Sequence, residues 1–121
     1  MKDYCIILLE ALERVHVMQS KKVPDLETVH KLVECDCVES VNLKGFDGDY
    51  IMLVDESGWL KEETFINVFA SLIYSGDPDS IAGNALILKR DRDNWRALTV
   101  REGAYILTVI KAAFKQWCES L

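Results

Sequence analysis

The chain has 121 residues, half of them hydrophobic, which is enough to build one domain around a sizeable core without disulfides or metal ions. Its formal net charge is −6, and all of it arises in residues 1–60, which hold six Lys/Arg against twelve Asp/Glu. An acidic chain repels phosphate backbones, so composition disfavours direct nucleic-acid binding. No apolar run reaches the roughly 18 residues of a membrane span, and the N-terminus lacks the features of a signal peptide. We therefore expect one compact domain over residues 1–121, located in the cytoplasm and not in a membrane.

The first third of the chain predicts two strands and a short helix. Residues 4–9 are continuously apolar and residues 14–19 alternate, which favours two strands joined by a turn at residues 11–13. Pro24-Asp25 then marks a helix start, with Asp25 at the N-cap position. The helix is predicted over about residues 26–34, and its apolar face consists of Leu26, Val29, His30 and Val33, with Leu32 at the edge.

The next segment predicts a hairpin. Residues 38–43 alternate and residues 50–54 are a compact apolar run. Asp47-Gly48 between them favours a tight turn, because glycine adopts positive φ without steric cost. We predict two antiparallel strands, followed by a second turn at residues 55–58.

Helical spacing returns at residues 62–74, where the predicted apolar stripe comprises Phe65, Val68, Phe69, Leu72 and Ile73. The stretch Ser75–Pro78 predicts the end of this helix. Residues 80–88 predict the final strand. Gly83-Asn84 stands at its entry, where a glycine indicates either a bend of the backbone or the close approach of another segment, and we favour close packing.

The C-terminal quarter predicts a polar connection at residues 89–96 and then a long helix. Thr99 and Glu102 have the spacing of a capping box, which opens a helix extending to about Ser120. Its inward-facing residues are predicted to be Ile106, Val109, Ile110, Ala113, Phe114 and Trp117. The whole pattern predicts an α+β (or α/β) domain, with a mainly antiparallel or mixed sheet of about five strands, two shorter helices and a long C-terminal helix.

Metal and thiol chemistry have little support in the sequence. Cys35 and Cys37 form a C-x-C pair, and adding His30 still leaves no convincing fourth ligand. We therefore predict no metal and no cofactor, with reduced thiols. Asp55 and Glu56 could bind a cation or act as acid and base, and the alternative is an acidic turn that caps its own backbone N–H groups.

Residues 89–96 read KRDRDNWR, a run whose opposite charges nearly cancel. Arg90, Arg92 and Arg96, together with Trp95, could hold an anionic group or a nucleotide base. The alternative is a solvated loop with local ion pairs of small energetic value.

Several short motifs, in order, resemble one known family. They are LETVHKLV (26–33), VESVNL (38–43), VDESGWL (54–60), FIN (65–67), IAGNALIL (81–88) and NWRALT (94–99). This arrangement resembles the domain-of-unknown-function family 3846 of phages, plasmids and conjugative elements. The sequence departs from the family pattern at Glu34, Cys35 and Asp36, where glycines are usual, and at Asp55, where Asn is usual. The positions that match are Glu39, Glu56, Gly58, Asn67 and Gly83.

The resemblance implies a context more than a chemistry. Such proteins occur in mobile-element genomes, often near anti-restriction genes, which implies an accessory role against a host defence system. Our main hypothesis is a non-enzymatic protein that binds and blocks a host defence protein with a basic surface. A homo-oligomeric form of this protein is an open alternative to a monomer. The candidate partner-binding residues are Glu34, Asp36, Glu39, Glu56 and Asn67.

Two other functions stay open. One is an oligomeric protein that sequesters a nucleotide-like immune signal in pockets at subunit junctions. Its candidate ligand-binding residues are Trp59, Arg90, Arg92, Trp95 and Arg96. The other is a small enzyme that uses Asp55 and Glu56.

Overall fold

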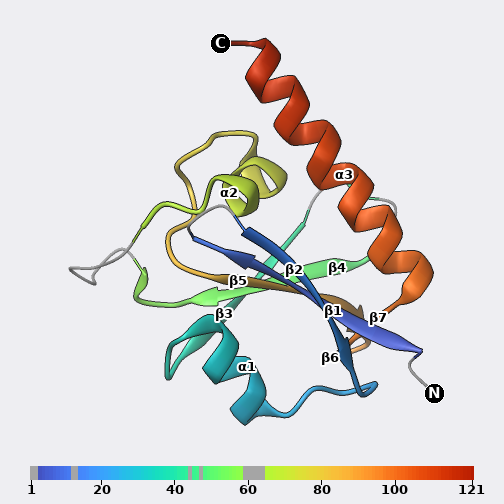
Figure 1. Ribbon diagram of the computed structural model, residues 1–121. Coiled ribbons are helices and arrows are strands. Elements are labelled where there is room, and N and C mark those ends of the chain that lie inside the picture. The colour runs from blue at the N-terminus through green and yellow to red at the C-terminus, as the bar shows by residue number, and fades with distance from the viewer. Residues whose placement is uncertain (1–2, 12–13, 44, 47, 59–64) are drawn as a thin grey trace.

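The computed structural model describes residues 3–11, 14–43, 45–46, 48–58 and 65–121 (Figure 1). Its elements are β1 (Tyr4–Glu10), β2 (Arg14–Ser20), α1 (Leu26–Val33), β3 (Val38–Asn42), β4 (Tyr50–Asp55), α2 (Val68–Ser75), β5 (Ala85–Asp91), β6 (Asn94–Arg96), β7 (Leu98–Thr99) and α3 (Val100–Glu119). The predicted α+β class is confirmed, with two short helices and a long C-terminal one.

The strands form one sheet in the order β2-β1-β5-β4-β3, and β6 and β7 pair with β5 and β1 respectively. Every pairing in it is antiparallel. The inner strands β1, β4 and β5 are buried over most of their length on both faces, whereas the edge strands β2 and β3 contain exposed residues. Continuous apolar runs therefore mark the strands that helices cover on both sides.

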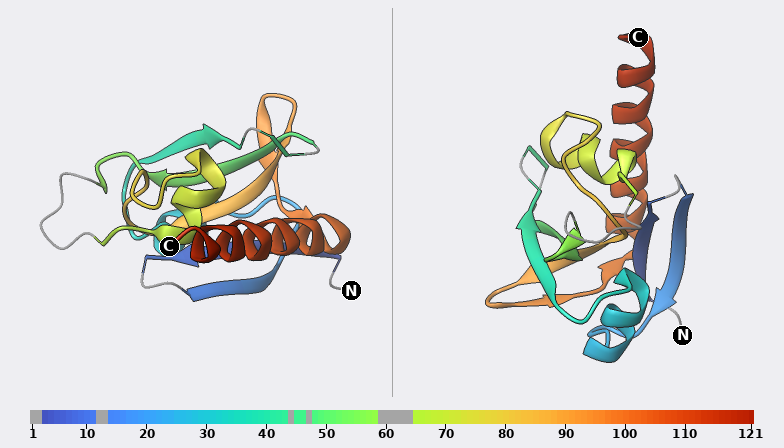
Figure 2. Two further views of the ribbon diagram at one scale, coloured as in Figure 1. Left: turned by 90° about the horizontal axis from the view of Figure 1, so that it is seen from above. Right: turned by 90° about the vertical axis from the view of Figure 1, so that its left-hand side faces the viewer.

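The sheet separates the core into two layers. One layer lies between the sheet and α1, and the other between the sheet and helices α2 and α3 (Figure 1). On the α2/α3 face, Ile7 and Met52 pack with Ile106 of α3. On the α1 face, Leu8 and Leu53 pack with Val29 of α1. The C-terminal part of α3 extends past the sheet (Figures 1 and 2), which explains why Val109, Ala113, Phe114 and Trp117 are only half-buried.

Helix α2 begins later than predicted. Residues 62–64 lie outside the described residues, and Phe65 and Ile66 are not helical, because Ile66 forms an isolated antiparallel bridge with Ala82. Asn67 is the N-cap, and its side-chain oxygen accepts a hydrogen bond from the Ala70 N–H at 3.0 Å. Phe65, predicted to face inward, is 57% exposed. A capping side chain therefore overrides an apolar spacing that would fit a longer helix.

The predicted polar connection at residues 89–96 is wrong. Strand β5 begins at Ala85, five residues later than predicted, and continues to Asp91, where a tight turn leads back into β6. Arg90 lies opposite Trp95, and Arg92 in the turn has a φ of 58°. Charged residues fit this hairpin because its tip, residues 91–94, is exposed, whereas Trp95 and Arg96 nearer its base are half-buried.

Two N-cap predictions and one helix-face prediction have different outcomes. Thr99 and Glu102 form both hydrogen bonds of the capping box. Asp25 occupies the N-cap of α1 but its side chain caps no N–H; its carboxylate pairs instead with Lys21 at 2.9 Å. Leu26, predicted on the apolar face of α1, is 54% exposed.

Two glycines are required for different physical reasons, and the reason predicted for Gly83 is wrong. A Cβ on Gly83 would meet nothing within 4 Å, so close packing is the wrong explanation; its φ of +84° is what favours glycine. Gly58 is the glycine that permits a close approach, because a Cβ there would lie 2.8 Å from the Ala82 carbonyl oxygen. The turn after β4 therefore packs directly against the segment that enters β5.

Candidate functional site

Five carboxylates gather at one end of the sheet, which we call the acidic end: Glu34, Asp36, Glu39, Asp55 and Glu56. They come together because β3 and β4 pair antiparallel, so that the start of one lies beside the end of the other. Val38 is opposite Asp55, and the Glu56 N–H donates to the Cys37 carbonyl at 3.1 Å. The structure thus unites four of the five predicted partner-binding residues.

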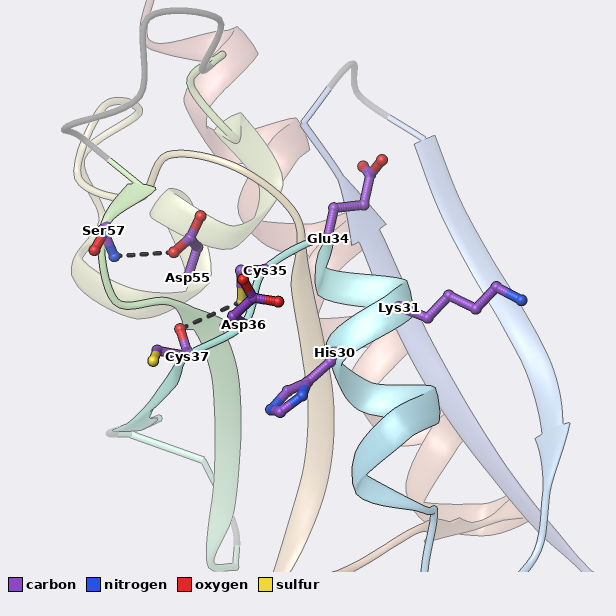
Figure 3. Close-up of a pocket in the computed structure, with 8 residues that line it drawn as sticks. All are labelled: His30, Lys31, Glu34, Cys35, Asp36, Cys37, Asp55 and Ser57. Atoms are coloured by element: carbon purple, nitrogen blue, oxygen red, sulfur yellow. Dashed lines mark hydrogen bonds between the residues drawn. The ribbon is translucent and has the colours of Figure 1, made fainter.

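The first hollow of the acidic end lies between the C-terminus of α1 and the end of β4, with a volume of about 500 Å³. Figure 3 shows His30 directed toward it and Lys31 directed away. Two of its contacts are local: the Cys35 thiol donates to the Cys37 carbonyl at 3.3 Å, and Asp55 accepts from the Ser57 N–H at 2.9 Å. The lining residues are His30, Lys31, Glu34, Cys35, Asp36, Cys37, Asp55 and Ser57.

The second hollow is smaller, about 220 Å³, and lies toward the α2/α3 face. Glu39, Val41 and Val54 supply one side from the β3–β4 pair. Ile81 and Ala82 supply the other from the segment before β5. Its complete lining is Glu39, Val41, Val54, Asp55, Glu56, Gly58, Tyr74, Ser80, Ile81 and Ala82. The apolar residues and Tyr74 were not predicted as site residues, because neither strand alternation nor helix spacing shows that these segments meet.

Carboxylates dominate the electrostatics of both hollows. The side-chain carboxylates of Glu39 and Glu56 have no hydrogen-bond or ion-pair partner among the described residues. The only basic side chains lining either hollow, among the residues that can be described, are His30 and Lys31 of the first. Such a surface attracts cations and basic proteins.

Asn67 does not belong to this surface, which corrects the predicted partner-binding set. It is fully buried, and its amide donates to the Leu9 carbonyl at 2.8 Å and the Gly83 carbonyl at 2.9 Å. Its side-chain oxygen also accepts from the Ala70 N–H. The Asn67 side chain therefore links β1, the start of α2 and the entry to β5. Its role is to fix the fold.

Asn84, to which the sequence pattern assigned no role beyond its place next to Gly83, also holds the fold together. Its side-chain oxygen accepts from the Ala11 N–H at 3.1 Å. Its amide donates to the Leu32 carbonyl at 3.0 Å and to the Glu34 carboxylate at 2.9 Å. Glu34 therefore belongs partly to the acidic end and partly to the attachment of α1, because Asn84 contacts its carboxylate.

The predicted arginine and tryptophan set is not assembled into one pocket. Trp59 lies outside the described residues. Arg90 faces the same side of the hairpin as Trp95, which packs against the α1-face core, and its guanidinium donates to Asn42. Arg92 is exposed in the turn.

Arg96 lies on the opposite face of the hairpin and is already engaged. Its guanidinium forms two hydrogen bonds with Glu102 of α3, at 2.8 and 3.0 Å. The bond from Arg96 lowers the pKa of the Glu102 carboxyl to about 2, aided by the Thr99 N–H, although partial burial opposes the shift. Arg96 therefore anchors α3 and does not face the same side as Arg90.

The cysteines and acids do not form a metal centre in the described part of the chain, where no group of three or more His, Cys, Asp and Glu side chains could hold an ion. All four cysteines are free thiols. Burial raises the pKa of the Cys5 thiol, and nearby Glu102 raises it further, which makes it a poor nucleophile. Asp55 caps the Ser57 N–H, as the structural interpretation of this acidic turn predicts.

Comparison with known proteins identifies a family. No curated protein and no solved structure matches the chain at a significant level. Within the described residues, no helix is both long and apolar enough to cross a membrane. The family model "Domain of unknown function (DUF3846)" matches residues 1–111, which include every motif quoted from the sequence. The chain therefore belongs to the domain-of-unknown-function family 3846.

Proposed function

We propose that this protein is an accessory protein of phages or other mobile elements that binds and blocks a basic protein of a host defence system. The observation that carries the proposal is the acidic end, where carboxylates from α1, β3 and β4 converge beside two hollows. The mobile-element context implied by the family resemblance supports the choice of a defence protein. Proteins that handle nucleic acids are the basic partners that such a surface would attract.

Charge placement favours binding over catalysis. Glu39 and Glu56 are exposed and make no ion pair among the described residues, so they can meet a cationic partner without first breaking a contact. Rim charges of this kind raise the association rate and give binding its salt dependence. Asp55, the other half of the proposed acid–base pair, is already used in its own turn.

The test is a plating assay in bacteria with an active defence system, comparing phage growth with and without this protein. The test variant is Asp36→Lys/Glu39→Lys/Glu56→Lys, which spares Glu34 because that carboxylate accepts a hydrogen bond from Asn84. The matched control is Asp77→Lys/Asp79→Lys/Glu119→Lys, whose three acids are exposed elsewhere. Each substitution replaces a negative charge by a positive one, so each triple variant changes the formal net charge from −6 to 0.

The wild type and the control should restore phage growth, and capture of one defence protein should weaken as salt is raised. The test variant should lose both effects. The proposal fails if the test variant protects the phage as well as the wild type does, or if the control loses protection equally.

A further inference from the structure

The second hollow combines an apolar interior with a charged rim. Alternation along β3 places Glu39 and Val41 on one face, and Glu39 lies directly opposite Val54 of β4. Ile81 and Ala82 form the facing wall. Glu39, Glu56 and the 39%-exposed Tyr74 are the exposed members of the lining.

Its walls are fixed before any partner arrives. The buried Ser71 hydroxyl accepts from the Ile81 N–H at 2.8 Å and is within 3.3 Å of the Ile81 carbonyl. The Asn67 N–H donates to the same carbonyl at 2.8 Å. Gly58 lies against the Ala82 carbonyl, where a Cβ would be only 2.8 Å away. A hollow that is already formed loses little conformational entropy on binding.

Size and chemistry together indicate the occupant. Drug-sized ligands occupy cavities of about 300–1,000 Å³, and this hollow, at about 220 Å³, is smaller. A long cationic side chain has an apolar stem for Val41 and Val54 and a charged end for Glu39 and Glu56. An aromatic ring such as that of Tyr74 adds attraction for the cation.

We propose that the second hollow receives one arginine or lysine side chain of the partner protein, with its stem on the valines and its charge between Glu39 and Glu56. This rests on the proposed function, because it names how the acidic end holds its basic partner. The first hollow then contributes long-range attraction, and the second contributes specificity.

The direct test uses the peptide acetyl-Gly-Gly-Arg-Gly-Gly-amide, titrated into the ¹⁵N-labelled protein. Its control peptide has citrulline, which is neutral and nearly the same shape, in place of arginine. The expected result is saturable shifts of the Val41, Val54, Ile81 and Ala82 amide signals with arginine, at least tenfold weaker with citrulline. Equal shifts with citrulline, or shifts spread evenly over both hollows, would overturn the proposal.

Two variants separate shape from charge. Glu39→Gln/Glu56→Gln neutralises the rim. Its control is Asp77→Asn/Glu119→Gln, which removes two charges at exposed residues that line neither hollow. Val41→Phe fills the hollow and leaves every charge in place. We expect at least tenfold weaker peptide binding for the rim and filling variants and less than a threefold change for the control. A thermal melt confirms that each variant is folded, and the rim variant decides the result if Val41→Phe does not fold.

The plating assay distinguishes the two proposals. If Val41→Phe and the rim variant keep protecting the phage while the Lys triple variant at the acidic end does not, partner binding stands and the side-chain pocket is wrong. If that triple variant still protects, the proposed function is wrong, and the peptide titration alone judges the hollow.

Discussion

The entry to β5 and the acidic end both contain residues that match the family pattern, but their polar side chains make different contacts. At the entry to β5, Asn67 and Asn84 each make three side-chain hydrogen bonds, and Asn67 is fully buried. At the acidic end, Glu39 and Glu56 are exposed and have no ion pair with any described residue. A matching motif position therefore does not reveal a functional surface; burial and hydrogen bonding separate residues that hold the fold from residues that are available to a partner.

The largest effect expected from this comparison follows removal of the Asn67 amide. Asn67→Ala should lower the free energy of unfolding by about 3 kcal/mol or more, because it removes a helix cap and takes the side-chain donor from the Leu9 and Gly83 carbonyls. Urea denaturation measures the change. Asn84→Ala, at a half-buried site, should cost less. A loss below about 1 kcal/mol for Asn67→Ala would contradict the scaffold role.

The next effect concerns the backbone at the same entry. Gly83→Val should cost about 2 kcal/mol, because a β-branched residue at a φ of +84° is strained even though the space around it is open. Gly83→Asn should be tolerated much better, since Asn adopts positive φ more readily. Thermal or urea unfolding of both variants checks this, and equal losses would point to packing as the cause.

A paired carboxylate sharpens the contrast with the acidic end. The pKa of Glu102 in the folded protein is about 2, below its ordinary value of 4.5. Its stabilising contribution is therefore fully present above about pH 4.5 and is lost as the pH falls toward 2. Glu102→Gln should cost about 1.5 kcal/mol at pH 7, and this difference from the wild type should shrink steadily across that acid range.

Urea denaturation at several pH values measures this dependence. Glu119→Gln, on an exposed residue of the same helix, is the control and should change the free energy of unfolding by less than about 0.5 kcal/mol throughout. A constant cost of Glu102→Gln down to pH 2 would exclude the Arg96 pair as its source.

The smallest effect is expected at the acidic end itself. Glu39→Gln/Glu56→Gln should change the free energy of unfolding by no more than about 0.5 kcal/mol, because neither carboxylate has a folded-state partner among the described residues. Chemical denaturation checks it. A loss above about 1.5 kcal/mol would mean that these acids also serve the fold, and the contrast between the two regions would disappear.

The sequence predicts elements well where a local signal determines them. The hairpin of β3 and β4, the capping box at Thr99 and the end of α2 at Gly76 each depend on neighbours within a few residues. Prediction fails where a distant partner decides. The bridge from Ile66 to Ala82 takes Phe65 out of the helix, and pairing with β4 and β6 turns the polar residues 89–91 into strand.

The candidate site shows the same division. The excess of acids before residue 60 indicates where negative charge would gather, and the structure brings four of the five named residues together. The second hollow could not be predicted, because Tyr74 and Ile81 reach it from α2 and the segment after it. Asn67 was misassigned because a polar residue at a helix start looks alike in sequence whether it is buried or exposed.

The place of β5 in the middle of the sheet has a consequence for synthesis on the ribosome. The β1–β2 and β3–β4 hairpins are made first, yet β5 is the strand that lies between β1 and β4. Until residues 85–91 have left the exit tunnel, the two hairpins have no shared strand, and their apolar edges stay open to other chains. In the interval between the exit of β4 and the exit of β5 from the tunnel, the nascent chain is therefore exposed to misassembly and to capture by chaperones.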